Sequence, residues 1–295
     1  MNEFKTYHPI VNFTYFILVI ALTCLIMHPI CLGISVFSSY TYLTILKDKK
    51  VIGSNFIYML ITFILMAAIN PLFNHEGVTI IQYFPNGSPL TMESIIYGMC
   101  AAAMIVSVIG YFSIYNEIMT SDKFIYLFGR ILPKFSIIIS MTLRFVPKYI
   151  KQFRSVSNAQ KCIGRDIQNG SIAKRCKVAF GVLSSMTSWC LENAIETADS
   201  MKARGYGHKG RTSFSIYTFD KRDIQALLFL IISGIYVIVG FLTDNLSFAY
   251  FPEISSLNIS PYTLSLFVSY FILCLCPVII ELWEVIKWKL LSSKN

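Results

Sequence analysis

Residues 198–207 read Ala198-Asp199-Ser200-Met201-Lys202-Ala203-Arg204-Gly205-Tyr206-Gly207. They end a predicted helix inside a basic stretch from Arg144 to Arg222, which holds 15 Lys and Arg against 5 acids, a net of +10. The whole chain carries +9, so the charges of all other residues nearly cancel. Because the long apolar runs lie almost entirely outside this stretch, the chain reads as a membrane protein with one inserted polar domain.

Composition supports this class. Hydrophobic residues make up 55% of the chain and charged residues 14%, and the mean hydropathy is +0.60. Soluble globular domains carry about 25% charged residues, so the values instead fit an all-α polytopic membrane protein. The aromatic residues lie in the apolar segments rather than between the basic ones, which argues against nucleic acid. A cytoplasmic face near anionic lipid and acidic partner proteins explains the charge better.

Six apolar runs are predicted to cross the bilayer, although several are near the short limit for a hydrocarbon core of about 30 Å. They are Val11–Met27, Ile30–Leu46, Asn55–Ile69, Ile95–Tyr115, Ile224–Leu242 and Tyr262–Leu282. Only His28-Pro29 joins the first two runs, which predicts a tight antiparallel pair of helices.

The loops between the runs predict an orientation. The first, third and last of these loops contain no Lys or Arg. Lysines follow the second span and the last one: Lys47, Lys49 and Lys50, then Lys287, Lys289 and Lys294. By the positive-inside rule, six spans with both termini in the cytoplasm satisfy every loop.

The third loop predicts a short extracytoplasmic hairpin near 77–91. The run from Val78 to Tyr83 alternates apolar and polar residues, and Asn86-Gly87 follows it. An Asn-Gly pair after such a run is a strong turn signal.

The segment Phe124–Leu143 is almost apolar enough to span, but Arg130, Pro133 and Lys134 interrupt it. If it crossed, the basic residues after it would lie outside the cell. We therefore predict an interfacial amphipathic helix, kinked near Pro133.

Two further helices are predicted in the basic stretch, and we expect them to cross at an angle. The first runs from about Ser136 to Lys161, with a possible bend at Pro147. Its polar stripe reads as a solvated or headgroup-contacting face: Arg144, Lys148, Lys151, Ser155 and Asn158. The second runs from about Ala173 to Arg204 with one apolar or small-residue face: Ala179, Val182, Leu183, Met186, Cys190, Ala194, Ala198 and Met201.

Sequence patterns of catalysis are missing. The piece from Gly207 to Thr212 lacks the spacing of a phosphate-binding loop. The eight Cys show no metal-ligand spacing, so neither a metal nor a cofactor is predicted. Glu281 and Glu284 near the end of the last span are expected to snorkel or to pair with Lys287 rather than relay protons.

Two motifs resemble a known family. Ala159-Gln160-Lys161-Cys162-Ile163-Gly164 is followed by some forty residues of mostly helix and then by Met201-Lys202-Ala203-Arg204-Gly205-Tyr206. Asp220-Lys221-Arg222-Asp223 precedes the next span. Together, from about 120 to 240, these are similar to the transmembrane T component of energy-coupling factor (ECF) transporters, which are ABC transporters.

The resemblance implies a scaffold whose long cytoplasmic coupling helices each end in an X-Arg-X motif docked on one of two ATPase subunits. It also implies a small membrane protein, the S component, that captures a vitamin or a transition-metal ion. The implied domains are 1–121 with four spans, 122–222 with the coupling helices, and 223–295 with two spans.

The expected ATPase-binding residues are Ala203, Arg204 and Gly205 at one helix end, and Ile163, Gly164 and Arg165 at the other. At the first motif the chain departs from the family, because Ile163 stands where an arginine is expected. Either Arg165, with Asp166 as a possible partner, takes the role from beyond the helix, or this end docks through Ile163 by apolar contact.

The sequence is therefore interpreted as a non-catalytic coupling subunit in a prokaryotic cytoplasmic membrane, with ATP hydrolysis in its partners. One alternative is the permease of a conventional ABC importer, which itself lines the substrate path. The other is a membrane-embedded enzyme, against which the missing acid, His and nucleophile motifs count. The substrate is not encoded here, because the family places that choice in the S component.

Overall fold

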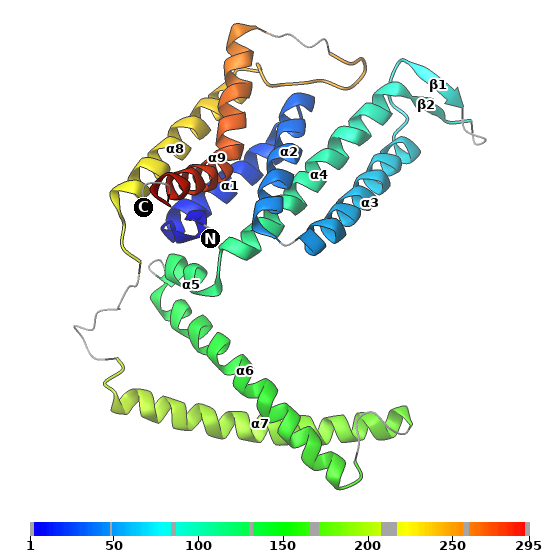
Figure 1. Ribbon diagram of the computed structural model, residues 1–295. Helices are drawn as coiled ribbons and strands as arrows, with labels where there is room; N and C mark the ends of the chain where they lie inside the picture. Colours follow the sequence, from blue (N-terminus) through cyan, green and yellow to red (C-terminus); the bar gives the residue numbers. More distant parts are fainter. Residues whose placement is uncertain are drawn as a thin grey trace. The chain divides into compact units, whose positions relative to one another are not determined.

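The regular structure of this chain is helical apart from one short strand pair. The computed structural model describes residues 3–47, 49–83, 87–129, 132–165, 171–207, 217–255 and 260–292. These residues form two compact units, drawn in Figure 1. Unit 1 is Met1–Phe124 with Tyr217–Asn295, and unit 2 is Ile125–Ile216.

Every predicted span falls on a helix of unit 1. These helices are α1 (Pro9–Leu25), α2 (Pro29–Leu46), α3 (Lys49–Phe73), α4 (Met92–Ile118), α8 (Lys221–Leu242) and α9 (Pro261–Ser292). Five are long and apolar enough to cross a membrane, whereas α1 has 17 residues and is the shorter apolar helix. The polytopic all-α fold class is thus confirmed, with five full-length candidate spans in the described part of the chain rather than six.

Proline explains where α2 begins, and α1 has already ended at Leu25. Residue Ile26 is extended, and His28 must be extended too because it precedes Pro29. His28 then caps α2 by accepting a hydrogen bond at Nδ1 from the backbone nitrogen of Ile30 (3.3 Å). The same His-Pro-Ile arrangement begins α1, where His8 Nδ1 accepts from Ile10 (3.3 Å).

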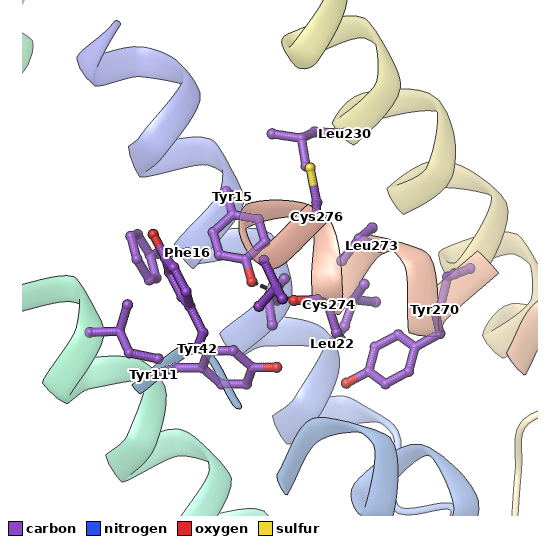
Figure 2. Close-up of a cluster of buried hydrophobic side chains, with 14 of the residues drawn as sticks. Tyr15, Phe16, Leu22, Tyr42, Tyr111, Leu230, Tyr270, Leu273, Cys274 and Cys276 are labelled. Atoms are coloured by element: carbon purple, nitrogen blue, oxygen red, sulfur yellow. Dashed lines mark hydrogen bonds between the residues drawn. The ribbon is translucent and has the colours of Figure 1, made fainter. Parts of the chain in front are cut away.

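Helices of unit 1 other than α3 pack around the larger of two buried clusters. In Figure 1, α4 lies between α2 and α3, and α9 contacts both α2 and α8. Large side chains from α1, α2, α4 and α9 meet in the cluster of Figure 2, among them Tyr15, Tyr42, Tyr111 and Tyr270, each at most 1% exposed. Helix α3 stands apart from this cluster, because its main neighbour is α4.

Helix α9 carries Pro277 in its interior, and side-chain hydroxyls bind its backbone just before that residue. The Cys274 carbonyl accepts hydrogen bonds from the Tyr15 hydroxyl (2.8 Å) and from Ser38 Oγ (2.6 Å). A proline removes one helical donor and crowds the preceding turn, so neighbouring helices commonly satisfy the backbone there. These contacts fasten α9 to α1 and α2 at its irregular turn.

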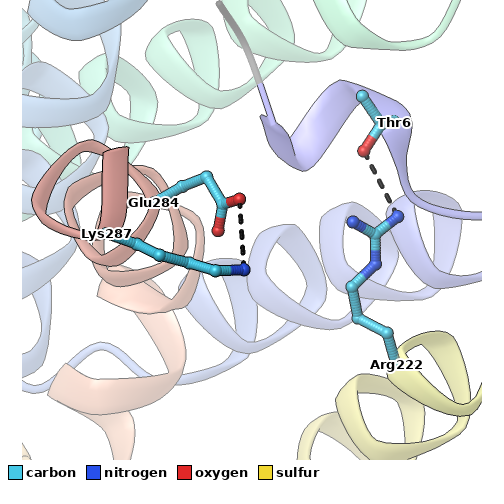
Figure 3. A network of polar contacts seen from close by, with 4 residues as sticks. All are labelled: Thr6, Arg222, Glu284 and Lys287. Atoms are coloured by element: carbon cyan, nitrogen blue, oxygen red, sulfur yellow. Dashed lines mark hydrogen bonds and ion pairs between the residues drawn. The ribbon is translucent and has the colours of Figure 1, made fainter. Parts of the chain in front are cut away.

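The first described residues form the 3-10 helix η1 (Glu3–Thr6), which is fastened to α8 and α9. Asp220 and Asp223 form a capping box at the start of α8, and Asp223 Oδ1 also accepts from the His8 backbone nitrogen (3.1 Å). Figure 3 shows Arg222 donating to Thr6 Oγ1 (3.3 Å). The resembling Asp220–Asp223 motif therefore has a structural role in this chain.

Two acidic residues of α9 behave differently from each other. Glu284 forms the predicted ion pair with Lys287 (3.7 Å), also drawn in Figure 3. Glu281 does not snorkel to solvent: it is 4% exposed and accepts a hydrogen bond from the Phe4 backbone nitrogen (3.2 Å). The prediction was wrong for Glu281 because sequence did not show that η1 folds back onto α9.

Lys123 ties the start of helix α5 (Ser121–Gly129) to η1 and α1. Its buried ammonium donates to the Lys5 carbonyl (2.6 Å). The Asn12 amide, oriented so that its nitrogen donates to Phe4 O (3.1 Å), accepts from the same ammonium at its oxygen (2.7 Å). Burial, with the nearby Lys5 charge, lowers the pKa of Lys123 from 10.5 to about 8.

This lowered pKa predicts how stability depends on pH. Between about pH 8 and 10.4 the unfolded state binds more protons at Lys123 than the folded state, so this residue's contribution to stability rises with pH. We expect Lys123→Met to remove this pH-dependent contribution from the Tm measured between pH 7.5 and 10.5 in detergent. Lys177→Met, at an exposed site, should keep the pH dependence of the unmodified protein. An unchanged slope in Lys123→Met would contradict the prediction.

The 77–91 segment forms an antiparallel strand pair between α3 and α4. Strand β1 (Ile80–Tyr83) pairs with β2 (Pro89–Thr91). The predicted turn residue Asn86 lies outside the described residues, while Gly87 has φ +81°. Glu93 in the first turn of α4 accepts from the Thr79 backbone (3.2 Å) and hydroxyl (2.8 Å), which fixes the strand pair to the helix.

Unit 2 contains two long helices, α6 (Pro133–Cys162) and α7 (Ile172–Ala203). The expected kinked helix over Phe124–Leu143 is wrong: α5 ends at Gly129 and a separate helix begins at Pro133. Proline is favoured at the first helical position, where its missing N–H is not needed, so Pro133 starts α6 instead of bending it. Pro147 lies inside α6, which continues through it.

Candidate functional site

The C-terminus of α7 is closed by a glycine in the left-handed conformation. Gly205 has φ +76°, and Arg204 is the last residue before it. The Tyr206 nitrogen donates to the Met201 carbonyl (3.0 Å) and the Gly205 nitrogen to the Lys202 carbonyl (2.9 Å). These two bonds define a Schellman motif, which ends the helix at a fixed position.

The C-terminus of α6 has the same geometry. Gly164 has φ +76°. The Arg165 nitrogen donates to the Gln160 carbonyl (3.0 Å), and the Gly164 nitrogen donates to the Lys161 carbonyl (3.0 Å). Gly164 therefore has the left-handed conformation that turns the chain away from the helix axis before Arg165. Asp166, the suggested partner of Arg165, lies outside the described residues.

The shared motif aligns the two helix ends residue by residue. Counting from the glycine, Ile163 takes the place of Arg204, and Arg165 takes the place of Tyr206. Both cap positions have similar backbone angles, with φ −90° and ψ 9° at Ile163 and φ −82° and ψ 8° at Arg204. Ile163, and not Arg165, therefore has the position at the end of α6 that Arg204 has at the end of α7.

The side chains at these ends are available to a partner. Ile163 is 70% exposed, and Arg204 and Arg165 are exposed as well. Within the described part of the chain, no hydrogen bond or ion pair holds the Arg204 side chain. Its guanidinium lies at the negative end of the α7 dipole and offers a planar set of donors for carboxylates or carbonyls.

Helices α6 and α7 contact each other through a polar and aromatic crossing. Lys148 donates to the buried Asn193 Oδ1, and its ammonium lies 5.5 Å from the centre of the Trp189 ring. Tyr149 meets the same ring edge-on at 5.6 Å and stacks with Phe145 at 5.8 Å. Lys148, predicted on a solvated stripe, therefore binds the partner helix.

The packed face of α7 overlaps the predicted one in part. Of the residues expected to pack, Leu183, Ala194 and Ala198 are exposed, whereas Ala179, Met186, Cys190 and Met201 are partly buried. Val182 is buried as predicted, but Asn193 belongs to the packed face. Lys148 and Tyr149 of α6 contact this face of α7. The hydrophobic pattern of α7 alone does not predict such polar and aromatic contacts.

Each capped end lies well beyond the crossing. Ile163 follows Lys148 by 15 residues and Arg204 follows Asn193 by 11, which at 1.5 Å per residue is about 22 Å and 16 Å of helix. The fold therefore does not bring the two motifs together in one site. It presents them as two separate docking points on helices joined at the crossing.

Known proteins share parts of this sequence, although no family model matches it. The "Energy-coupling factor transporter transmembrane protein EcfT" of Lactobacillus helveticus is 34% identical over 98 residues, which is 33% of this chain and 35% of that protein. The EcfT 1 protein of Listeria monocytogenes is 30% identical over 106 residues, 35% of this chain and 40% of that protein.

This chain is EcfT-like. The resemblance predicted from the helix-end motifs is therefore confirmed, and five helices of the described chain are long and apolar enough to cross a membrane. The chain spans about a third of the length of the curated EcfT relatives it matches. It is also similar to the "Uncharacterized protein MG181" of Mycoplasma genitalium, at 34% identity over 110 residues, 37% of this chain and 26% of that protein.

Among the residues that the structure describes, no group of three or more His, Cys, Asp or Glu is placed to hold a metal ion. The free cysteines of this EcfT-like chain divide between both units, with Cys274 and Cys276 buried in α9 and Cys162 exposed near the α6 cap. The two capped ends present an exposed cation, Arg204, and an exposed apolar side chain, Ile163.

Proposed function

We propose that this chain is the non-catalytic transmembrane coupling subunit of an ECF-type importer. It transmits the motion of two ATPase subunits to a separate substrate-binding membrane protein that takes up a vitamin or a transition-metal ion. The observation that carries the proposal is the pair of helices with identical Schellman ends, crossing at one point and presenting Arg204 and Ile163 as exposed tips.

The geometry supports coupling rather than simple anchoring. In this proposal the crossing, held by the Lys148–Asn193 hydrogen bond and the Trp189 contacts, transmits displacement of either tip to the other helix. In the same proposal, Ala203, Arg204 and Gly205 dock on one ATPase. Ile163 and Gly164 dock on the other, and Arg165, the alternative arginine, lies beyond the cap. The membrane domain is 1–121 with 223–295, and 122–222 is the coupling domain.

The orientation follows from the loop charges. We place both termini and the basic coupling domain in the cytoplasm of a prokaryotic cell, where lysines after α2 and at the end of α9 agree with the positive-inside rule. ATP is hydrolysed by the partner subunits, which share this compartment.

Affinity purification from native membranes tests the proposal. We expect two ABC-type ATPase chains and a small membrane protein to co-purify with the tagged chain. The purified ATPases should rebind stripped inside-out vesicles, which expose the cytoplasmic face, but not right-side-out vesicles. Purification of ATPases without a separate substrate-binding membrane protein would instead favour a conventional permease.

A further inference from the structure

A cavity of about 80 Å³ lies between α2, α3 and α4 near the ends that carry Lys47 and Lys49. Its walls include Leu43 of α2, Asn55 and Tyr58 of α3, and Ile109 and Ser113 of α4. One water needs only about 10–15 Å³ of such space, so the cavity admits a larger group. Neither the capped helix ends nor the crossing uses it.

One nitrogen donor in this cavity calls for an acceptor, and a lysine ammonium lies beside the cavity. The Asn55 Nδ2 atom is buried and has no hydrogen-bond partner among the described residues. Next to the cavity, the Lys47 ammonium donates to Ser113 Oγ (2.8 Å), which uses one of its three donors. Buried polar groups are normally paired, so an oxygen-rich group of negative charge fits this end of the cavity.

The position of the cavity indicates where that group comes from. Helix α4 has 27 residues and is about 40 Å long, which exceeds a hydrocarbon core of about 30 Å by about 5 Å at each end. Ser113 lies five residues, or about 7.5 Å, before the helix end at Ile118. This depth is close to the boundary between lipid chains and headgroups.

The cavity also has apolar side chains at its rim. Tyr58 is 67% exposed and Ile109 is 46% exposed, on helices long and apolar enough to span. An acyl chain can lie along this surface while the phosphate of the same molecule reaches the cavity. A free phosphate ion would make no use of the apolar rim.

We propose that this cavity binds the headgroup of an anionic phospholipid, whose phosphate accepts hydrogen bonds from Lys47 and Asn55. A zwitterionic headgroup fits less well, because it brings its own cation to the Lys47 ammonium. The bound lipid bridges α3 to α2 and α4 and so stabilises the helix that otherwise packs mainly on α4. This site is independent of the transport proposal.

Thermal unfolding of the purified, delipidated full-length protein tests the site. Phosphatidylglycerol should raise Tm saturably, whereas phosphatidylcholine and millimolar inorganic phosphate should not. Lys47→Met and Asn55→Leu should each weaken the phosphatidylglycerol response at least fivefold, while Lys177→Met, at an exposed lysine of unit 2, should leave it unchanged. An equal response in all variants, or an equal response to inorganic phosphate, would overturn the proposal.

Native mass spectrometry of the unmodified protein provides a second readout that does not depend on the variants folding. Released from mixed nanodiscs, the protein should retain phosphatidylglycerol in preference to phosphatidylcholine, at a stoichiometry of one. Equal retention of the two lipids would show that the protein does not select an anionic headgroup, and the proposed site would be rejected.

Discussion

Replacing Arg204 with glutamate is expected to abolish uptake and to prevent ATPase binding, while the protein still inserts and folds. The side chain is exposed and unpaired within the described residues, so its loss leaves unit 2 intact. In a partner's groove, however, acceptors placed for a guanidinium would face a carboxylate. An uncompensated buried charge of this kind costs about 3–5 kcal/mol, or more than a hundredfold in affinity.

The measurement is uptake in cells together with the amount of ATPase that co-purifies. Lys202→Glu is the matched control, because it makes the same charge change in the same turn at a side chain that is 77% exposed and 3.7 Å from Asp199. It should affect uptake less than twofold. Wild-type transport in Arg204→Glu would contradict the docking role. Arg204 would then act only through its interaction with the helix dipole, which contributes about 0.3–1 kcal/mol of stability.

The second prediction concerns the end of α6, where sequence left two candidates. Because the Schellman motif gives Ile163 the position of Arg204, we expect Ile163→Glu to lower uptake at least tenfold by placing a charge in an apolar contact. Arg165→Ala should change uptake less than twofold, because Arg165 corresponds to Tyr206 beyond the cap. Both variants keep Gly164, so the helix still ends at the same residue.

A strong defect in Arg165→Ala with normal uptake in Ile163→Glu would reverse this assignment. Arg165 would then reach the partner from beyond the helix, and adding Ile163→Arg to the Arg165→Ala variant should restore part of the activity. Melting temperatures of all variants control for loss of the fold.

Sequence determined the parts of this protein that depend on local chemistry. Uninterrupted apolar runs predicted the membrane helices, because backbone groups in lipid must bond within their own helix. The helix ends predicted near Lys161 and Arg204 are confirmed, since Gly164 and Gly205 adopt positive φ there without strain. The two motifs that carry the EcfT resemblance were therefore visible before any tertiary contact was known.

Contacts between distant segments decided the rest. Glu281 is buried because η1 folds onto α9 across more than 270 residues of chain, and Lys148 is a crossing residue because Asn193 and Trp189 face it. The packed face of α7 also depends on α6, since several of its apolar side chains remain exposed. The sequence pattern shows which side chains are apolar. The tertiary structure decides which of them are buried, because only a packed partner surface excludes water from them.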